Sequence, residues 1–160
     1  MAPGIDVTVA AVIERDGRFL LVEERAGGHL VLNQPAGHLE HGESLLAAVT
    51  RETLEETGHH FTPSHVVGFY LWYSEEAETS YLRVAFCGSA QAPAGPATRD
   101  EGIVAVHWLS RAQILSRERH LRSPMVVRCL DDYLAGRRYA LDCLTYLEIA
   151  ALARGKTAHA

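Results

Sequence analysis

The sequence predicts one mixed α/β domain, of the α+β type. Short apolar runs separated by Gly, Pro and Asp indicate strands along most of residues 7–110. One amphipathic helix, ended by Gly58, interrupts them. Several strands precede this helix, which argues against a strict repeat of strand–helix–strand units. The 160 residues suffice for a full core, with about 70% of the unfolded surface buried.

The first strands are predicted from alternation and turn residues. The stretch DVTVAAVIERDGRFLLVEE is typical of a β-hairpin, with alternating apolar residues and a turn at Asp16–Gly17. HLVLN indicates a short strand, and the loop after it is broken by Pro35, Gly37 and Gly42. We therefore expect a hairpin followed by an irregular loop before the first helix.

The remaining elements follow in chain order. A helix is expected from about Glu43 to Thr57, with Gly58 as its left-handed cap. HVVGFYLWYSE and TSYLRVAFCGSAQ predict two long strands joined by an acidic turn, and IVAVHWLS predicts another strand. Ser110 is a candidate cap for a helix over RAQILSRE. Further helices are expected over SPMVVRCLDDYLAG and over the apolar stretch YALDCLTYLEIAALA, with an ordered core at about 5–150 and a frayed tail at 154–160.

Composition excludes several classes of protein. A net charge of −5 and a pI near 6.0 argue against binding to nucleic acid or to an anionic membrane. The sequence contains no run of about 18 apolar residues, the length needed to span a bilayer. The three cysteines are scattered, with no C-x-x-C pair, which is typical of reduced thiols in the cytoplasm.

The segment RETLEETG places three carboxylates close together. On a helix, Glu52, Glu55 and Glu56 fall within an arc of about 100°, and like charges at this spacing repel by a few tenths of a kcal/mol per pair. An apolar stripe of Leu46, Val49 and Thr53 lies beside them. Water, an arginine or a divalent cation could compensate the repulsion. By itself, E-x-x-E-E is most often a solvated acidic face.

The longer string GHLEHGESLLAAVTRETLEETGH changes this interpretation. It resembles the signature of the Nudix hydrolases, G-x5-E-x7-R-E-U-x-E-E-x-G-U, where U is aliphatic. Thr53 and His59 depart from the aliphatic positions, and His59 is expected to face solvent. Neither departure involves a carboxylate. The positions that match in register are Gly37, Glu43, Arg51, Glu52, Glu55, Glu56 and Gly58.

The resemblance implies an α/β/α sandwich with a mixed sheet, in which the signature forms a loop-helix-loop catalytic motif. It implies Mg²⁺ or Mn²⁺ as cofactor, and a substrate in which a nucleoside diphosphate is linked to another group. Arg51 would orient the glutamates, and Glu43 would assist a second metal or hold the loop. The implied metal ligands are the carboxylates of Glu52, Glu55 and Glu56 and the carbonyl of Gly37.

Residues outside the signature are candidates for catalysis and binding. The general base is one of the helix glutamates or a loop acid, Asp100 or Glu101. Arg83 interrupts an apolar strand, so it either contacts a substrate phosphate or pairs with an acid at the edge of the core. Arg122, at a helix start, is a second candidate for the phosphate. Aromatic residues on the two long strands, Trp72 and Tyr81 among them, either pack on the sheet or stack on a substrate ring.

Five further stretches, VTVAAVIERDGRFLLVEE, NQPAGHLEHGESL, YLRVAF, LRSPMVV and GRRYAL, are similar to a bacterial phosphatase subgroup of the family. This implies release of single phosphates from nucleoside tri- and diphosphates, hydroxymethylpyrimidine pyrophosphate and thiamine pyrophosphate. The alternatives are hydrolysis of ADP-ribose or dinucleotides, and a non-catalytic nucleotide sensor. We expect a monomer or a homodimer, formed by residues 1–160 as a single domain.

Overall fold

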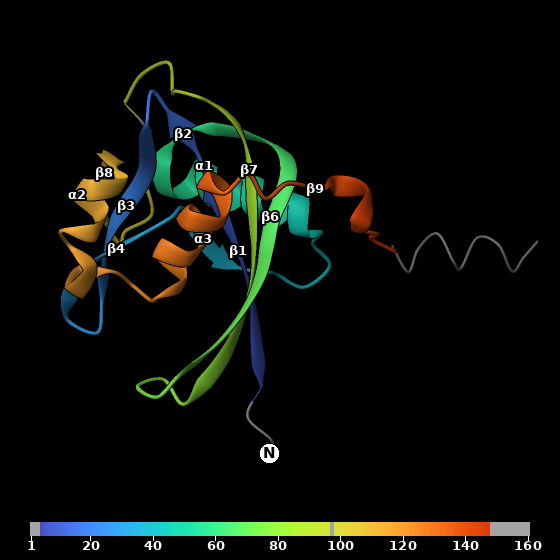
Figure 1. The fold of residues 1–160 in the computed structure, drawn as a ribbon, viewed down its shortest axis with the longest axis horizontal. Helices are drawn as coiled ribbons and strands as arrows, with labels where there is room; N and C mark the ends of the chain where they lie inside the picture. Colours follow the sequence, from blue (N-terminus) through green and yellow to red (C-terminus); the bar gives the residue numbers. More distant parts are fainter. Residues whose placement is uncertain (1–3, 97, 148–160) are drawn as a thin grey trace, which may run out of the picture.

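The computed structural model describes residues 4–96 and 98–147, and its strands lie between helices on two sides (Figure 1). The helices are α1 (Leu45–Thr57), α2 (Arg111–Leu115) and α3 (Met125–Leu134), with 3-10 turns at Glu118–His120 and Leu141–Cys143. The strands are β1 (Ile5–Val12), β2 (Glu14–Arg15), β3 (Arg18–Ala26), β4 (His29–Asn33), β5 (Ala36–His38), β6 (His60–Ser74), β7 (Thr79–Gln91), β8 (Ile103–Ser110) and β9 (Tyr139–Ala140).

The strands form two sheets. The first has the order β5-β1-β7-β6-β9, with β1 parallel to β7 and the other neighbours antiparallel. In the second, β3 pairs with β2, β4 and β8. The mixed sheet confirms the predicted fold class. The long β6–β7 hairpin and strand β8 confirm the strands predicted over residues 65–75, 79–91 and 103–110.

The hairpin predicted for the first two strands forms only beside its turn. The turn at Asp16–Gly17, where both residues have positive φ, joins β3 only to the two-residue β2. Strand β1 instead pairs with β5 and β7. Residues 9–12 are at most 1% exposed, so both faces of β1 need cover, and a position inside the first sheet supplies it.

Two helix predictions also need correction. The helix over residues 111–118 ends at Leu115, although Ser110 caps it as expected, in a capping box with Gln113. Residues 139–147 are not helical: Tyr139–Ala140 pairs with β6, and a 3-10 turn follows. The preceding helix closes at Gly136, whose φ of 81° turns the chain back to the sheet. The predictions for residues 148–160 lie outside the described part of the chain.

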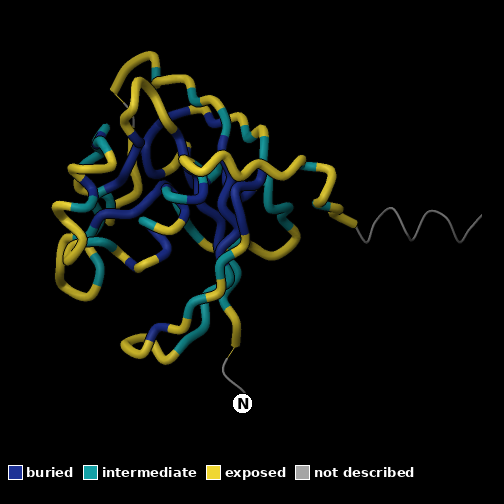
Figure 2. The backbone as a smooth tube through the Cα atoms, viewed as in Figure 1, coloured by how far each residue is buried: buried dark blue, intermediate teal, exposed yellow. Residues whose placement is uncertain are grey.

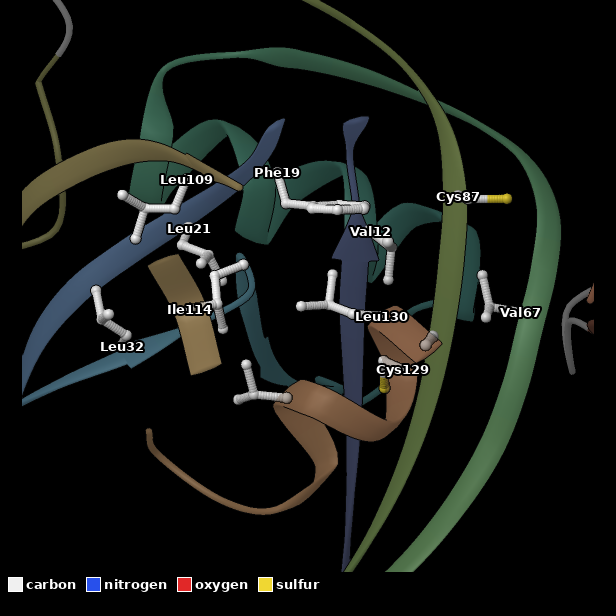
Figure 3. Packing of buried hydrophobic residues seen from close by; sticks show 12 residues of the cluster. Val12, Phe19, Leu21, Leu32, Val67, Cys87, Leu109, Ile114, Cys129 and Leu130 are labelled. Atoms are coloured by element: carbon white, nitrogen blue, oxygen red, sulfur yellow. The ribbon is translucent and has the colours of Figure 1, made fainter. Parts of the chain in front are cut away.

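The buried stretches of backbone lie in the middle of the molecule (Figure 2). The core consists of two clusters of buried side chains, one on each side of the strands, and Figure 3 shows the cluster that contains Phe19 and Leu130. Alternate residues of β7 supply them: Ala85 and Cys87 face α2 and α3, whereas Val84 and Phe86 face α1. Each fully buried large apolar side chain stabilises the fold by about 1.5–3 kcal/mol. The sandwich therefore holds α1 rigidly against the first sheet. No helix in the described ranges is long and apolar enough to cross a membrane.

Candidate active site

Helix α1 presents the acidic residues. Ser44 caps its start by accepting a hydrogen bond from the Ala47 amide, and Gly58 ends it with φ of 73°. The buried Val49 and Thr53 fix the rotation of the helix against the sheet. The first helical residue is thus Leu45 rather than Glu43, which instead lies in the loop before the cap.

Arg51 offsets the repulsion between the carboxylates by donating hydrogen bonds to them. Its Nε and Nη2 donate to the two oxygens of Glu43, at 2.9 and 3.0 Å. Its Nη1 donates to Glu52 at 2.8 Å and to Glu55 at 3.1 Å. Nη2 also reaches the carbonyl oxygen of His38, at 3.1 Å. One guanidinium thus organises three carboxylates and the loop before the helix, and its hydrogen bonds hold the pKa of Glu43 below its usual value.

Glu56 and Glu52 lie in a different environment. Burial raises the pKa of Glu56 to about 9, and repulsion from Glu24, Glu52 and Asp100 adds to this, although the Ala36 amide donates to Glu56 Oε2 at 2.9 Å. Burial also raises the pKa of Glu52. Because burial disfavours the ionised form of these two carboxyl groups, a cation bound beside them would stabilise that form strongly.

Gly37, in β5, lies directly over Glu52. A Cβ added at this position would lie 2.1 Å from Glu52 Cδ, so only glycine allows the strand backbone to approach the carboxylate this closely. The close approach follows from the pairing of β5 with β1, which holds residue 37 opposite Val9.

The residues present fit a hard divalent cation. Glu52, Glu55 and Glu56 each keep one carboxylate oxygen to which no described residue donates. With the Gly37 carbonyl they would form an all-oxygen ligand set, which suits Mg²⁺ or Mn²⁺. In residues 4–96 and 98–147 no three potential ligands already converge on one point. Side chains would therefore move when a metal binds, and water or substrate oxygens would complete its shell.

The acidic helix faces a cavity of about 670 Å³. Its walls bring together residues from distant segments: Glu52, Glu55 and Glu56 of α1, Gly37 and His38 of β5, Trp72 and Tyr81 of the long hairpin, Arg83, Arg122 and Asp100. Asp100 also donates its backbone amide to the Glu55 carbonyl, at 3.1 Å. Glu101 is exposed and does not line the cavity. Of the two loop acids, only Asp100 lies beside the carboxylates.

Comparisons with known proteins agree with this geometry. The NUDIX domain family profile matches residues 3–129. Phosphatase NudJ of Escherichia coli (strain K12) is 38% identical over 138 residues, which cover 86% of this chain and 89% of that protein. The solved NUDIX hydrolase from Nitrosomonas europaea is 47% identical, with a TM-score of 0.87 and coverage of 90% and 98%. The chain belongs to the Nudix family.

The Nudix resemblance of the signature is therefore confirmed, and so is its closer similarity to a phosphatase subgroup, of which NudJ is the relative found. Like other members of the family, the protein is a hydrolase of phosphoric anhydride bonds. The E. coli ORF135 protein, at 24% identity and a TM-score of 0.67, shares the fold.

For Arg83 the sequence left two alternatives, contact with a substrate phosphate or pairing with an acid, and its surroundings in this Nudix domain differ from the second. It is 4% exposed and donates to Gln34 Oε1 at 3.1 Å and Asn33 Oδ1 at 3.3 Å. Among the described residues no carboxylate lies within ion-pair distance, so the expected pairing with an acid is wrong. Arg122 is more exposed and lies 3.7 Å from Glu24.

The aromatic residues fall into two groups. Trp72 and Tyr81 are opposite one another on β6 and β7, and their rings stack with centroids 5.9 Å apart and planes at 22°. Both line the cavity. Tyr70 instead donates its hydroxyl to Asp132 at 3.0 Å, on the side of α3. The stacked pair is therefore the part of the hairpin that is placed to contact a substrate ring.

Sequence reasoning missed several residues of this site and misplaced a residue outside it. Glu24, Thr8 and Ser123 line the cavity, but no local pattern marks them as site residues, so only the fold places them there. His59 was expected to face solvent. It is 7% exposed, and its ring packs edge-on against Trp108. The end of α1 is buried, and Trp108 packs against the core cluster on the α1 side of the strands, so His59 is covered as well.

Proposed function

We propose that this Nudix domain is a Mg²⁺-dependent phosphatase of the NudJ type, for which Mn²⁺ can substitute. Its substrates would be nucleoside tri- and diphosphates, hydroxymethylpyrimidine pyrophosphate and thiamine pyrophosphate, with inorganic phosphate as a product. Three free cysteines, Cys87, Cys129 and Cys143, support a reducing compartment, and we place the enzyme in the cytoplasm.

The observation that carries the proposal is the complete acidic site on one wall of a roomy polar cavity. Three glutamates beside Gly37 each keep one carboxylate oxygen free: Glu52, Glu55 and Glu56. Arg83 and Arg122 line the same cavity. A cavity of about 670 Å³ is large enough for a nucleotide-sized ligand. Opposite charges on its walls suit a polyphosphate that a cation bridges to carboxylates.

The residues would divide the work as follows. A bound Mg²⁺ would neutralise the charge that develops on the phosphoryl oxygens. Arg51 keeps the carboxylates oriented, and Glu43 anchors that arginine. Asp100, or one of the helix glutamates, would accept a proton from the attacking water. Because Glu101 lies away from the cavity, we assign the loop acid's role to Asp100.

On the substrate side, Arg83 and Arg122 would hold phosphate oxygens through charge-assisted hydrogen bonds. Trp72 and Tyr81 would contact the ring of the substrate. Stacking is tolerant of ring identity, because every base has a π face, so this contact supports a broad choice of base.

The test is product analysis with a small substrate panel. The panel holds hydroxymethylpyrimidine pyrophosphate, thiamine pyrophosphate, nucleoside di- and triphosphates and ADP-ribose, each with Mg²⁺ and with EDTA. Stepwise inorganic phosphate from the first four, lost in EDTA, is the expected result. AMP and ribose 5-phosphate from ADP-ribose alone would replace the substrate assignment by that of a pyrophosphatase. Nucleotide binding without turnover would indicate a sensor, and activity in EDTA would contradict the metal site.

A further inference from the structure

Three buried polar atoms without a hydrogen-bond partner lie around the same cavity. They are Thr8 Oγ1, Arg83 Nε and Ser123 Oγ, and they are the only buried side-chain nitrogen or oxygen atoms of this kind in the described ranges. Their residues are 7%, 4% and 6% exposed. Folded proteins pair nearly all such atoms, because a buried polar atom without a partner loses its hydrogen bonds to water and gains none in return. Their concentration on one cavity indicates a site for a ligand that accepts hydrogen bonds.

The charge of Arg83 points to an anionic ligand. Its two terminal nitrogens donate to neutral amide oxygens, those of Gln34 and Asn33, and the thiol of Cys129 lies beside the guanidinium. In the part of the chain that the structure describes, Arg83 has no ion pair with an acid. A buried cation without a counter-ion is costly, so an anion entering the cavity would be strongly favoured here.

The tertiary contacts bring the three residues to one place. Thr8 and Arg83 are direct neighbours across the parallel β1–β7 pair. The segment that contains Ser123 is tied to β4, because the Arg122 amide donates to the Leu32 carbonyl at 2.8 Å. Gln34 completes the link: it accepts from Arg83 and donates to the Val126 carbonyl at 2.8 Å.

The start of α3 adds to the positive potential. Ser123 lies two residues before this ten-residue helix, and no side chain caps its first amides. The uncapped amino end of a helix carries a partial positive charge and favours anions. Met125, the first helical residue, lines the cavity together with Ser123 and Arg122.

We propose that Thr8, Arg83 and Ser123 form a phosphoryl subsite that is distinct from the carboxylates of α1. The carboxylates would hold one substrate phosphate through the metal, and this subsite would bind another. Two hydroxyls and one N–H match the oxygens of a phosphoryl group, and the guanidinium supplies its counter-charge. That this phosphate belongs to a substrate rests on the proposed function. Binding of the phosphoryl group itself does not.

The first experiment measures binding of inorganic phosphate to the full chain by calorimetry, in EDTA and again in Mg²⁺. Thr8→Val and Ser123→Ala each remove one hydroxyl with little change of shape. Each should weaken phosphate binding roughly 10-fold, as for loss of a hydrogen bond to a charged group. Thr62→Val and Ser89→Ala remove exposed hydroxyls away from the cavity and are the matched controls. Their affinities should equal that of the wild type.

Thermal unfolding without phosphate separates this subsite from a purely structural role. Because the two hydroxyls have no partner, Thr8→Val and Ser123→Ala should unfold at or above the wild-type temperature. Lower unfolding temperatures with unchanged phosphate affinity would mean that the hydroxyls hold a buried water, which would overturn the proposal. Absence of phosphate binding to the wild type in both buffers would also overturn it.

Arg83 is tested by Arg83→Lys, which keeps the charge but cannot donate to both amides and to a phosphate. It should weaken phosphate binding at least 10-fold, and circular dichroism checks its fold. With a substrate from the panel, all three variants should raise KM more than they lower kcat. If the wild type binds phosphate in this way but releases none from the panel, the proposed function fails and the subsite remains. Variants that bind phosphate as the wild type does would refute the subsite whatever the panel shows.

Discussion

Replacing Gly37 with alanine tests the geometry on which the metal site depends. The added Cβ would lie 2.1–2.3 Å from three atoms of the Glu52 carboxyl group. Carbon atoms in contact are normally about 3.5–4 Å apart, so the carboxylate or the strand must shift by about 1.5 Å. The 2.8 Å hydrogen bond from Arg51 to Glu52 would be lost or bent.

The size of the effect follows from that shift. A hydrogen bond between charged groups contributes about 1.5–3 kcal/mol, so the free energy of unfolding should fall by an amount in this range. A displacement of about 1 Å at a catalytic group can cost ~10²-fold in rate. We therefore expect Gly37→Ala to lower kcat/KM for phosphate release by about 100-fold and to weaken Mn²⁺ binding by about tenfold.

The assay compares phosphate release, Mn²⁺ affinity and urea unfolding with those of Gly95→Ala. Gly95 has nothing within 4 Å of an added Cβ and no positive φ, so its variant should behave as the wild type. A folded Gly37→Ala protein with kcat/KM and Mn²⁺ affinity within about threefold of the wild type would refute the reasoning, because Glu52 would then not need its observed position.

Two other variants test the acidic site. Glu56→Gln should lower turnover in Mg²⁺ by at least ~10²-fold, and near-normal turnover would remove Glu56 from the site. In EDTA, the wild type's free energy of unfolding should fall as pH rises from 4.5 toward 9, by up to ~1.4 kcal/mol per unit, because folding raises the pKa of Glu56 and the folded state then binds more protons. Glu56→Gln should lack this slope in urea titrations, and an unchanged slope would exclude Glu56 as its source. In Arg51→Lys the ammonium cannot donate to Glu43, Glu52 and Glu55 at the same time. The free energy of unfolding should therefore fall by ~1–3 kcal/mol, and Mn²⁺ should bind more weakly. Wild-type stability and Mn²⁺ affinity, both measured by calorimetry, would contradict the role of Arg51 in holding the carboxylates.

Local features of the molecule were largely predictable. The helix of residues 45–57, its left-handed end at Gly58 and the grouping of the three glutamates all follow from a period of 3.6 residues. The capping box at Ser110 depends on residues only three positions apart. Such features are decided within a few turns of chain, and nothing elsewhere in the fold opposes them.

The pairing of β6 with β7 was predictable because a short acidic turn joins them, but the partners of other strands were not. The turn at Asp16–Gly17 formed, yet β1 paired with a strand about 75 positions away. A turn limits only the strands beside it, whereas burial of both faces of β1 depends on what the whole chain can place there. The apolar segment from Tyr139 likewise joined β6 instead of forming a helix, because it follows a sharp turn at Gly136 and meets an open sheet edge.

The sequence by itself determined the chemistry on one wall of the cavity: a helix with three carboxylates, and an arginine and a glycine at spacings that hold them. Only the tertiary structure decided the opposite wall. Thr8, Arg83 and Ser123 lie far apart in the chain. Arg83 stands out in the sequence only as a charge within an apolar strand, and nothing local connects it with the other two residues. Their shared cavity comes from sheet pairing and helix packing, which act between distant segments, and so no short motif records it.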